Sequence, residues 1–196
     1  MTTTKRKTGA TSGRRAGISL LLIALISGCS SATSSGTGTY SPTFDIDRTY
    51  TVAVIPLEKS PYVKPKDLQA LYDMLAMGLL KAGIFKVVER QRIKDVLKEQ
   101  EFQYSGLVDE STAVEFGKLL GADVVAMYDI LTARMRNDGY GKVYMLEIVV
   151  KLVDTKTGEI IYFGRGTGYG ATKGEAMENA VKGALKYLYE MTGRKK

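Results

Sequence analysis

The chain has 196 residues, of which 44% are hydrophobic and 25% are charged, and its formal net charge is +7. This composition indicates one ordinary folded domain with an appended segment, and it excludes a disordered or a disulfide-rich chain. The sequence holds one cysteine and no histidine, which excludes histidine-dependent nucleophile pairs and zinc sites that use histidine.

The N-terminal residues have the pattern of an export signal. A basic stretch leads into a nine-residue apolar run at residues 18–26. This run is too short to cross a membrane, because a spanning helix needs roughly 20 apolar residues. Small residues follow at Ser27 and Gly28. We therefore predict a signal peptide over residues 1–28.

The single cysteine follows this run directly. Ile26-Ser27-Gly28-Cys29 resembles the lipobox of bacterial lipoproteins, where a lipid is attached to the cysteine and the chain is cleaved just before it. The resemblance implies lipidation of Cys29 with fatty acids such as palmitate, and two or more acyl chains anchor a protein stably. Ser30, in place of aspartate, implies anchoring in the outer membrane with the domain facing the periplasm. A plain signal peptide without lipidation is the alternative.

A stretch rich in serine, threonine and glycine comes next, and it cannot bury a core. We predict that residues 29–43 form the lipidated cysteine and a flexible tether, residues 44–193 the folded domain, and residues 194–196 a basic tail. From residue 29 onward the chain holds 23 basic and 21 acidic residues, a balance of +2. We expect no nucleic-acid partner, because such a chain has little general attraction to phosphate backbones.

Hydrophobic periodicity in the domain predicts a single-domain α/β fold, in which helices cover a mixed β-sheet in the order βαβααβββα. Asn137-Asp138-Gly139 lies between two long segments with strand character and predicts a β-hairpin. The strands are predicted at residues 51–55, 85–88, 123–134, 142–154 and 159–165, and the helices at residues 66–81, 91–101, 111–120 and 174–191.

The glycine-rich segment at residues 164–170 lies where a dinucleotide-binding loop would lie. Position 171 is alanine, however, and no further strand follows to supply an acidic residue for a ribose. We interpret the segment as an irregular edge strand with glycine bulges. The close acidic pairs, Asp45 with Asp47 and Asp109 with Glu110, lack the ligand number of a calcium loop. We thus expect no catalytic, cofactor-binding or metal-binding residue, no nucleotide partner and no enzymatic activity.

The aromatic residues favour a protein-binding role. The chain has 12 tyrosines, 5 phenylalanines and no tryptophan, and tyrosine combines a large contact area with a polar tip. Several tyrosines fall in expected loops or at the ends of elements. Our hypothesis places an interface at the hairpin tip and the glycine-rich strand, with the residues Arg134, Arg136, Asn137, Tyr140, Arg165 and Tyr169.

Three segments resemble the CsgG family of curli assembly and secretion lipoproteins. They are residues 87–100, which begin Val87-Val88-Glu89-Arg90, residues 105–123, which end Gly117-Lys118-Leu119-Leu120-Gly121-Ala122-Asp123, and residues 146–159. The resemblance covers about residues 50–190. It implies a lipobox joined to an α/β periplasmic domain, an envelope protein partner or a homo-oligomer, and no catalytic residue.

The curli channel of this family inserts two long hairpins per subunit into the membrane, and a membrane-crossing hairpin needs roughly 20 or more residues. The corresponding regions here, residues 131–145 and 162–173, are shorter and carry charges or glycines. We therefore expect a short member that lacks those hairpins.

Our leading hypothesis is a non-enzymatic outer-membrane lipoprotein that binds envelope proteins in a secretion or surface-assembly apparatus of the curli type. The alternatives are a regulator of a peptidoglycan synthase, which the short tether disfavours, a pore-forming secretion subunit, and an enzyme that uses carboxylate, lysine or tyrosine groups.

Overall fold

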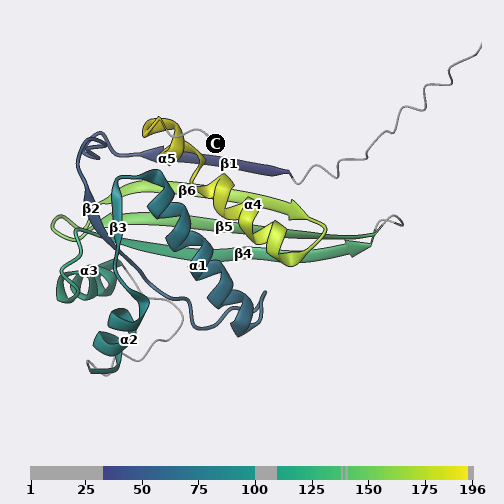
Figure 1. Ribbon diagram of the computed structural model, residues 1–196, viewed down its shortest axis with the longest axis horizontal. Helices are drawn as coiled ribbons and strands as arrows, with labels where there is room; N and C mark the ends of the chain where they lie inside the picture. Colours follow the sequence, from purple (N-terminus) through teal and green to yellow (C-terminus); the bar gives the residue numbers. More distant parts are fainter. Residues whose placement is uncertain (1–32, 100–109, 138, 140, 194–196) are drawn as a thin grey trace, which may run out of the picture.

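A six-stranded sheet forms the centre of the molecule, and the computed structural model describes residues 33–99, 110–137, 139 and 141–193 (Figure 1). The strand order is β1-β6-β5-β4-β2-β3. β2 pairs in parallel with β3 and β4, whereas the other neighbours pair in antiparallel fashion. The strands are β1 Ser34–Tyr40, β2 Tyr50–Val54, β3 Phe85–Val87, β4 Val124–Asn137, β5 Lys142–Asp154 and β6 Ile160–Gly170.

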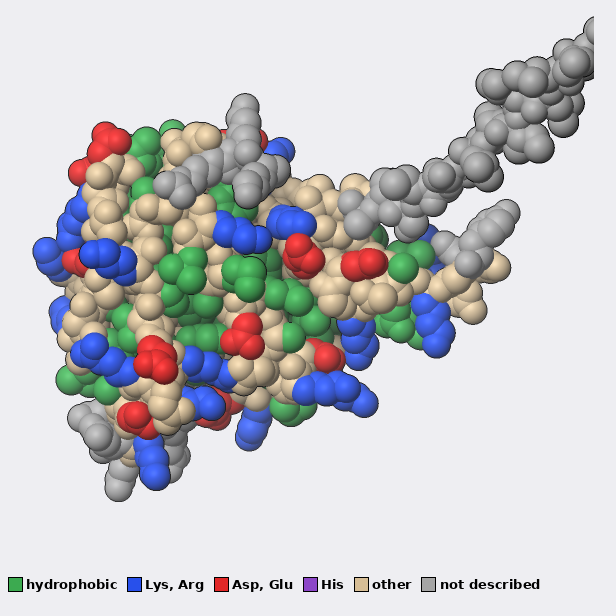
Figure 2. Space-filling model, viewed as in Figure 1, with side chains coloured by type: hydrophobic (Ala, Val, Ile, Leu, Met, Phe, Trp, Pro, Cys, Tyr) green, Lys and Arg blue, Asp and Glu red, His purple; other side chains and the backbone are tan. Residues whose placement is uncertain are grey.

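Helices cover the two faces of the sheet unequally. They are α1 Pro65–Ala82, α2 Arg90–Glu99, α3 Glu110–Leu119, α4 Lys173–Ala184 and α5 Lys186–Met191. α1, α4 and α5 pack on one face and bury the main core with it. Figure 2 shows this helix-covered face, where hydrophobic side chains are visible among charged ones, and Met77 and Leu80 of α1 are more than half exposed. α2 and α3 bury a smaller core on the opposite face.

Local sequence signals explain where the two main helices begin and end. The stripe of leucines at positions 68, 71, 75 and 79 of α1 is buried, as the helical spacing predicts. Gly83 ends α1 with φ 78°, a conformation that glycine adopts without a Cβ clash. Thr172 starts α4 with a capping box, because its side chain accepts from the Glu175 N–H while the Glu175 carboxylate accepts from the Thr172 N–H.

The predicted fold class is confirmed. The chain forms a single α/β domain with a mixed sheet, and from β2 onward the elements follow the predicted order. Two differences are found: an additional strand, β1, precedes the predicted series, and the last helix is divided into α4 and α5 at Leu185.

The prediction of a flexible tether is wrong for Ser34–Tyr40, which form β1 along the outer side of β6. The segment has no apolar alternation that could signal a strand, and its side chains contribute little to the core. It is held by the antiparallel ladder, which depends on backbone groups alone. The signal peptide at residues 1–28, Cys29 and the tail at residues 194–196 lie outside the described residues.

The interpretation of residues 164–170 as an irregular edge strand is also wrong. They belong to β6, an inner strand whose register with β1 is continuous. Their glycines have a packing role instead. A Cβ on Gly164, Gly166 or Gly168 would lie less than 3.0 Å from backbone atoms of α4. α4 meets these strands through small residues of its own, Ala176, Ala180, Gly183 and Ala184, so helix and sheet approach backbone to backbone.

We predict that Gly166→Ala destabilises the domain by roughly 2–3 kcal/mol, because the new methyl group overlaps the Ala180 carbonyl and the Ala184 amide, which cannot move separately. Urea denaturation of the chain without its first 29 residues measures the change. Gly174→Ala is the matched control, since its Cβ would meet only the Thr172 hydroxyl oxygen at 3.9 Å. Equal stability of the two variants would contradict the role of this contact.

Candidate functional site

The face of the sheet opposite α1 and α4 is covered over only part of its area. Among the described residues, the smaller core on this side draws on β2, the start of β4, α2, α3 and the segments joined to them. It contains no residue of β1, β5 or β6. We call the uncovered side of β1, β6, β5 and β4 the open sheet face. The end of this sheet that bears the β4–β5 hairpin extends past α4 (Figure 1).

The open sheet face presents a mixture of apolar, hydroxyl and charged side chains. Cross-strand partners point to the same side of a sheet, so Arg134, Met145 and Tyr169 form one row across three strands. Glu147 and Arg165 form an ion pair, with 2.6 Å between the carboxylate oxygen and the guanidinium nitrogen. Tyr169 is 41% exposed, and Met145 and Glu147 are half-buried, whereas Val149 on the same face is buried. A surface of this composition is suited to protein contact.

A β-bulge decides which residues of β4 reach this face. The β4–β5 register shifts between Ile130 and Thr132, which leaves Leu131 without a partner. A bulge reverses the alternation of the strand beyond it, because successive side chains point to opposite faces. Arg134 therefore lies opposite Met145 on the open sheet face instead of facing the helices.

The structure brings together part of the interface expected from the sequence. Arg134, Arg165 and Tyr169 share the open sheet face, and Arg136 follows on the same side of β4. Asn137 ends β4 at the predicted hairpin, which is confirmed, and its side-chain oxygen accepts from the Gly139 N–H at 3.3 Å. Tyr140 lies outside the described residues.

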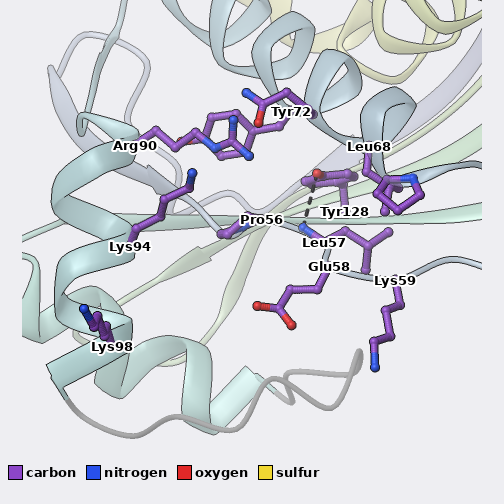
Figure 3. Close-up of a pocket in the computed structure, with 12 residues that line it drawn as sticks. Pro56, Leu57, Glu58, Lys59, Leu68, Tyr72, Arg90, Lys94, Lys98 and Tyr128 are labelled. Atoms are coloured by element: carbon purple, nitrogen blue, oxygen red, sulfur yellow. Dashed lines mark hydrogen bonds between the residues drawn. The ribbon is translucent and has the colours of Figure 1, made fainter.

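A second feature is a cleft of about 530 Å³ between α2, the start of α1 and the loop after β2 (Figure 3). We call it the basic cleft, because Arg90, Lys94 and Lys98 line it from α2. Tyr72 of α1 and Tyr128 of β4 lie at its inner end. The rest of the wall is mainly apolar and is formed by Pro56, Leu57, Pro65 and Leu68, together with Glu58, Lys59 and Gln69.

The two tyrosines of the basic cleft are held in the neutral form. Burial raises the pKa of Tyr128 to about 12, and its hydroxyl oxygen accepts from the Leu57 N–H at 3.3 Å. Burial also raises the pKa of Tyr72, although the positive charge of Arg90 partly offsets this effect. The Arg90 guanidinium lies 4.7 Å from the centre of the Tyr72 ring, in a cation–π contact. The Tyr72 hydroxyl and the Arg90 Nε are both buried without a hydrogen-bond partner.

The basic cleft was not predicted from the sequence. Arg90, Lys94 and Lys98 recur at intervals of four, which would place them on one side of a helix, and this spacing was the available signal. Tyr72 follows the apolar stripe of its helix and gives no separate signal. Tyr128 reaches the cleft only because β4 lies beside β2 in the sheet.

The described residues show neither a metal site nor a membrane-spanning helix. No group of three or more cysteine, aspartate or glutamate side chains there could hold a metal ion. None of the helices in this part of the chain is long and apolar enough to span a membrane.

The comparisons with known proteins agree with the fold. The model of the family "Curli production assembly/transport component CsgG" matches residues 60–186, and the chain belongs to this family. The resemblance noted in the sequence is thereby confirmed. No curated protein matches the chain.

Solved structures of two other proteins are similar. The PelC dodecamer from Paraburkholderia phytofirmans has a TM-score of 0.54 and 15% identity, covering 80% of this chain and 97% of that one. Lipoprotein GNA1162 from Neisseria meningitidis has a TM-score of 0.50 and 15% identity, covering 74% of this chain and 99% of that one. At this identity the likeness shows a common fold.

The raised pKa of Tyr128 predicts a fall in stability at alkaline pH. A tyrosine whose pKa is 10.0 when unfolded and about 12 when folded stabilises the fold fully below pH 10. That stabilisation is lost as the pH rises from about 10 to 12. We predict that Tyr128→Phe removes roughly 2–3 kcal/mol of this pH dependence, measured by urea denaturation at pH 9 and pH 12. If the free energy of unfolding falls between pH 9 and pH 12 as much in the variant as in the wild type, Tyr128 does not cause the pH dependence.

Proposed function

We propose that this protein is a non-enzymatic, outer-membrane-anchored lipoprotein that faces the periplasm and assembles into a homo-oligomer. This oligomer would bind envelope proteins as part of a secretion or surface-assembly apparatus. Membership of the CsgG family supports a role in envelope assembly. The observation that carries the proposal is the open sheet face, a large surface that no described element covers apart from its end near α3.

The open sheet face suits a second copy of this chain. Antiparallel sheets tolerate one solvated face, but exposed Tyr169 beside half-buried Met145, with half-buried Phe163 farther along β6, makes a surface that gains from being covered. The near-balance of charge beyond residue 28, 23 basic against 21 acidic residues, leaves little repulsion between copies. The similar fold of PelC occurs in a dodecamer, which supports assembly of this fold with copies of itself.

The distance from the proposed anchor to the fold supports a role close to the membrane. β1 begins at Ser34, five residues after Cys29. Five residues span at most about 18 Å even when fully extended. A lipid on Cys29 would therefore hold the domain against its membrane, which suits a membrane-bound assembly better than a regulator that must reach a distant synthase.

The homo-oligomer can be tested with a matched pair of tyrosines. Tyr169 is 41% exposed on the open sheet face, and Tyr62 is 47% exposed in the loop before α1. We predict that Tyr169→Ala weakens self-association tenfold or more, since a central aromatic residue often dominates an interface, and that Tyr62→Ala has no effect. Native mass spectrometry of the detergent-solubilised protein measures the assembly. A monomeric wild-type protein would contradict the proposed homo-oligomer.

The anchor is tested separately by metabolic labelling with palmitate. We predict that the wild-type protein takes up the label and fractionates with the outer membrane. Cys29→Ala should lose the label and leave the membrane fraction, because its only thiol is gone. An unlabelled wild-type protein would remove the lipoprotein part of the proposal and leave the assembly part standing.

A further inference from the structure

The basic cleft has the features of a binding site that the assembly role leaves unused. It lies between α1 and α2 and reaches Tyr128, which faces the α1 side of the sheet, whereas Tyr169 and Arg134 belong to the opposite side. Occupation of the open sheet face by another copy would therefore not by itself use this cleft. Its lining carries four cationic side chains, those of Lys59, Arg90, Lys94 and Lys98, and a single carboxylate, that of Glu58.

We propose that the basic cleft binds an acidic peptide segment in an extended conformation, supplied by a partner protein. The three cations of α2 follow one another at four-residue intervals, which corresponds to steps of about 6 Å along the helix. Alternate side chains of an extended peptide lie on one side at intervals of about 6.6 Å. A peptide with acidic residues at every second position thus matches the three cations in register.

The wall of the cleft opposite α2 would contact the peptide side chains that point away from the cations. Half-buried Pro56 and Leu57 present an apolar surface across the cleft from α2, and Leu68, which is 3% exposed, adds little to it (Figure 3). In an extended segment the residues between the acidic ones point away from the cations. Apolar residues at those positions would pack on this wall, so the cleft favours alternating acidic and apolar residues over a uniformly acidic run.

The inner end of the cleft holds two polar groups that a carboxylate could satisfy. Tyr72 is 3% exposed, and its hydroxyl has no hydrogen-bond partner. The adjacent Arg90 Nε is also unpartnered, although the Arg90 side chain is only half-buried. A change of rotamer at Arg90 would move its guanidinium off the Tyr72 ring, and one carboxylate could then accept from Arg90 and from the Tyr72 hydroxyl. A hydrogen bond from a charged partner is stronger than one between neutral groups, which would offset the lost cation–π contact.

The test uses the detergent-solubilised full-length protein and a fluorescein-labelled peptide of alternating glutamate and valine, followed by fluorescence anisotropy. We expect saturable binding that weakens as salt is added, and at least tenfold weaker binding of the glutamine–valine peptide. Arg90→Gln and Lys94→Gln should each reduce the affinity of the glutamate peptide at least fivefold. Lys118→Gln is the matched control, because Lys118 is an exposed lysine in the last turn of α3.

Tyr72→Phe separates a binding role from a structural one. Removing a buried hydroxyl that has no partner should leave the free protein at least as stable as the wild type. The same change should weaken peptide binding, because the carboxylate loses a donor. A variant that loses stability but binds normally would overturn the assignment of this hydroxyl to the ligand.

Three results would overturn the proposal itself. These are equal binding of the two peptides, an affinity unchanged by Arg90→Gln and Lys94→Gln, and displacement of the peptide by inorganic phosphate at equal or lower concentration. The last result would identify the cleft as a phosphate site. None of them bears on self-association through the open sheet face, which Tyr169→Ala measures.

Discussion

The close approach of α4 to the sheet is the contact on which the rest of the structure depends. Glycines of β6 and β1 remove the side chains that would hold the helix away, and Gly36 of β1 meets Gly183 of α4 backbone to backbone. Because the two backbones are in contact, β1 is held against both β6 and α4, although it contributes almost no apolar side chain to the core. α4 covers the face of β6 that bears the glycines. Any binding role of this strand therefore belongs to the residues between the glycines, which point to the other face.

The alternation seen in β6, with one face packed on helices and the other open, extends across the sheet. The residues opposite the β6 glycines, such as Leu146, Ile148 and Val150 of β5, are buried under the helices. Their neighbours in the chain form the open sheet face. On β4 the bulge at Leu131 exchanges the two sides, which brings Arg134 into a row with Met145 and Tyr169. Stability and the proposed assembly thus draw on alternate residues of the same strands, and a substitution on one face need not disturb the other.

The proposed anchor, the open sheet face and the basic cleft would act together at a membrane. β1 leads directly from the chain beyond Cys29 into the edge of the sheet, so a lipid would hold that edge near the bilayer. The open sheet face would bind further copies, and the basic cleft, between α1 and α2, would bind an acidic segment of another protein. Two separate surfaces would let a homo-oligomer form while each copy still receives a partner.

The sequence by itself determined the elements whose side chains carry a periodic signal. The leucine stripe of α1, the alternation in β5 and the turn at Asn137-Asp138-Gly139 each predicted an element that the structure contains. Only the tertiary structure decided the rest. β1 is held by backbone hydrogen bonds, which have no sequence signature, and the glycines of β6 gain their role from the helix that packs on them. The basic cleft joins Tyr72, Arg90 and Tyr128, which are distant in the chain and become neighbours only because the parallel pairing of β2 with β3 and β4 brings their elements together.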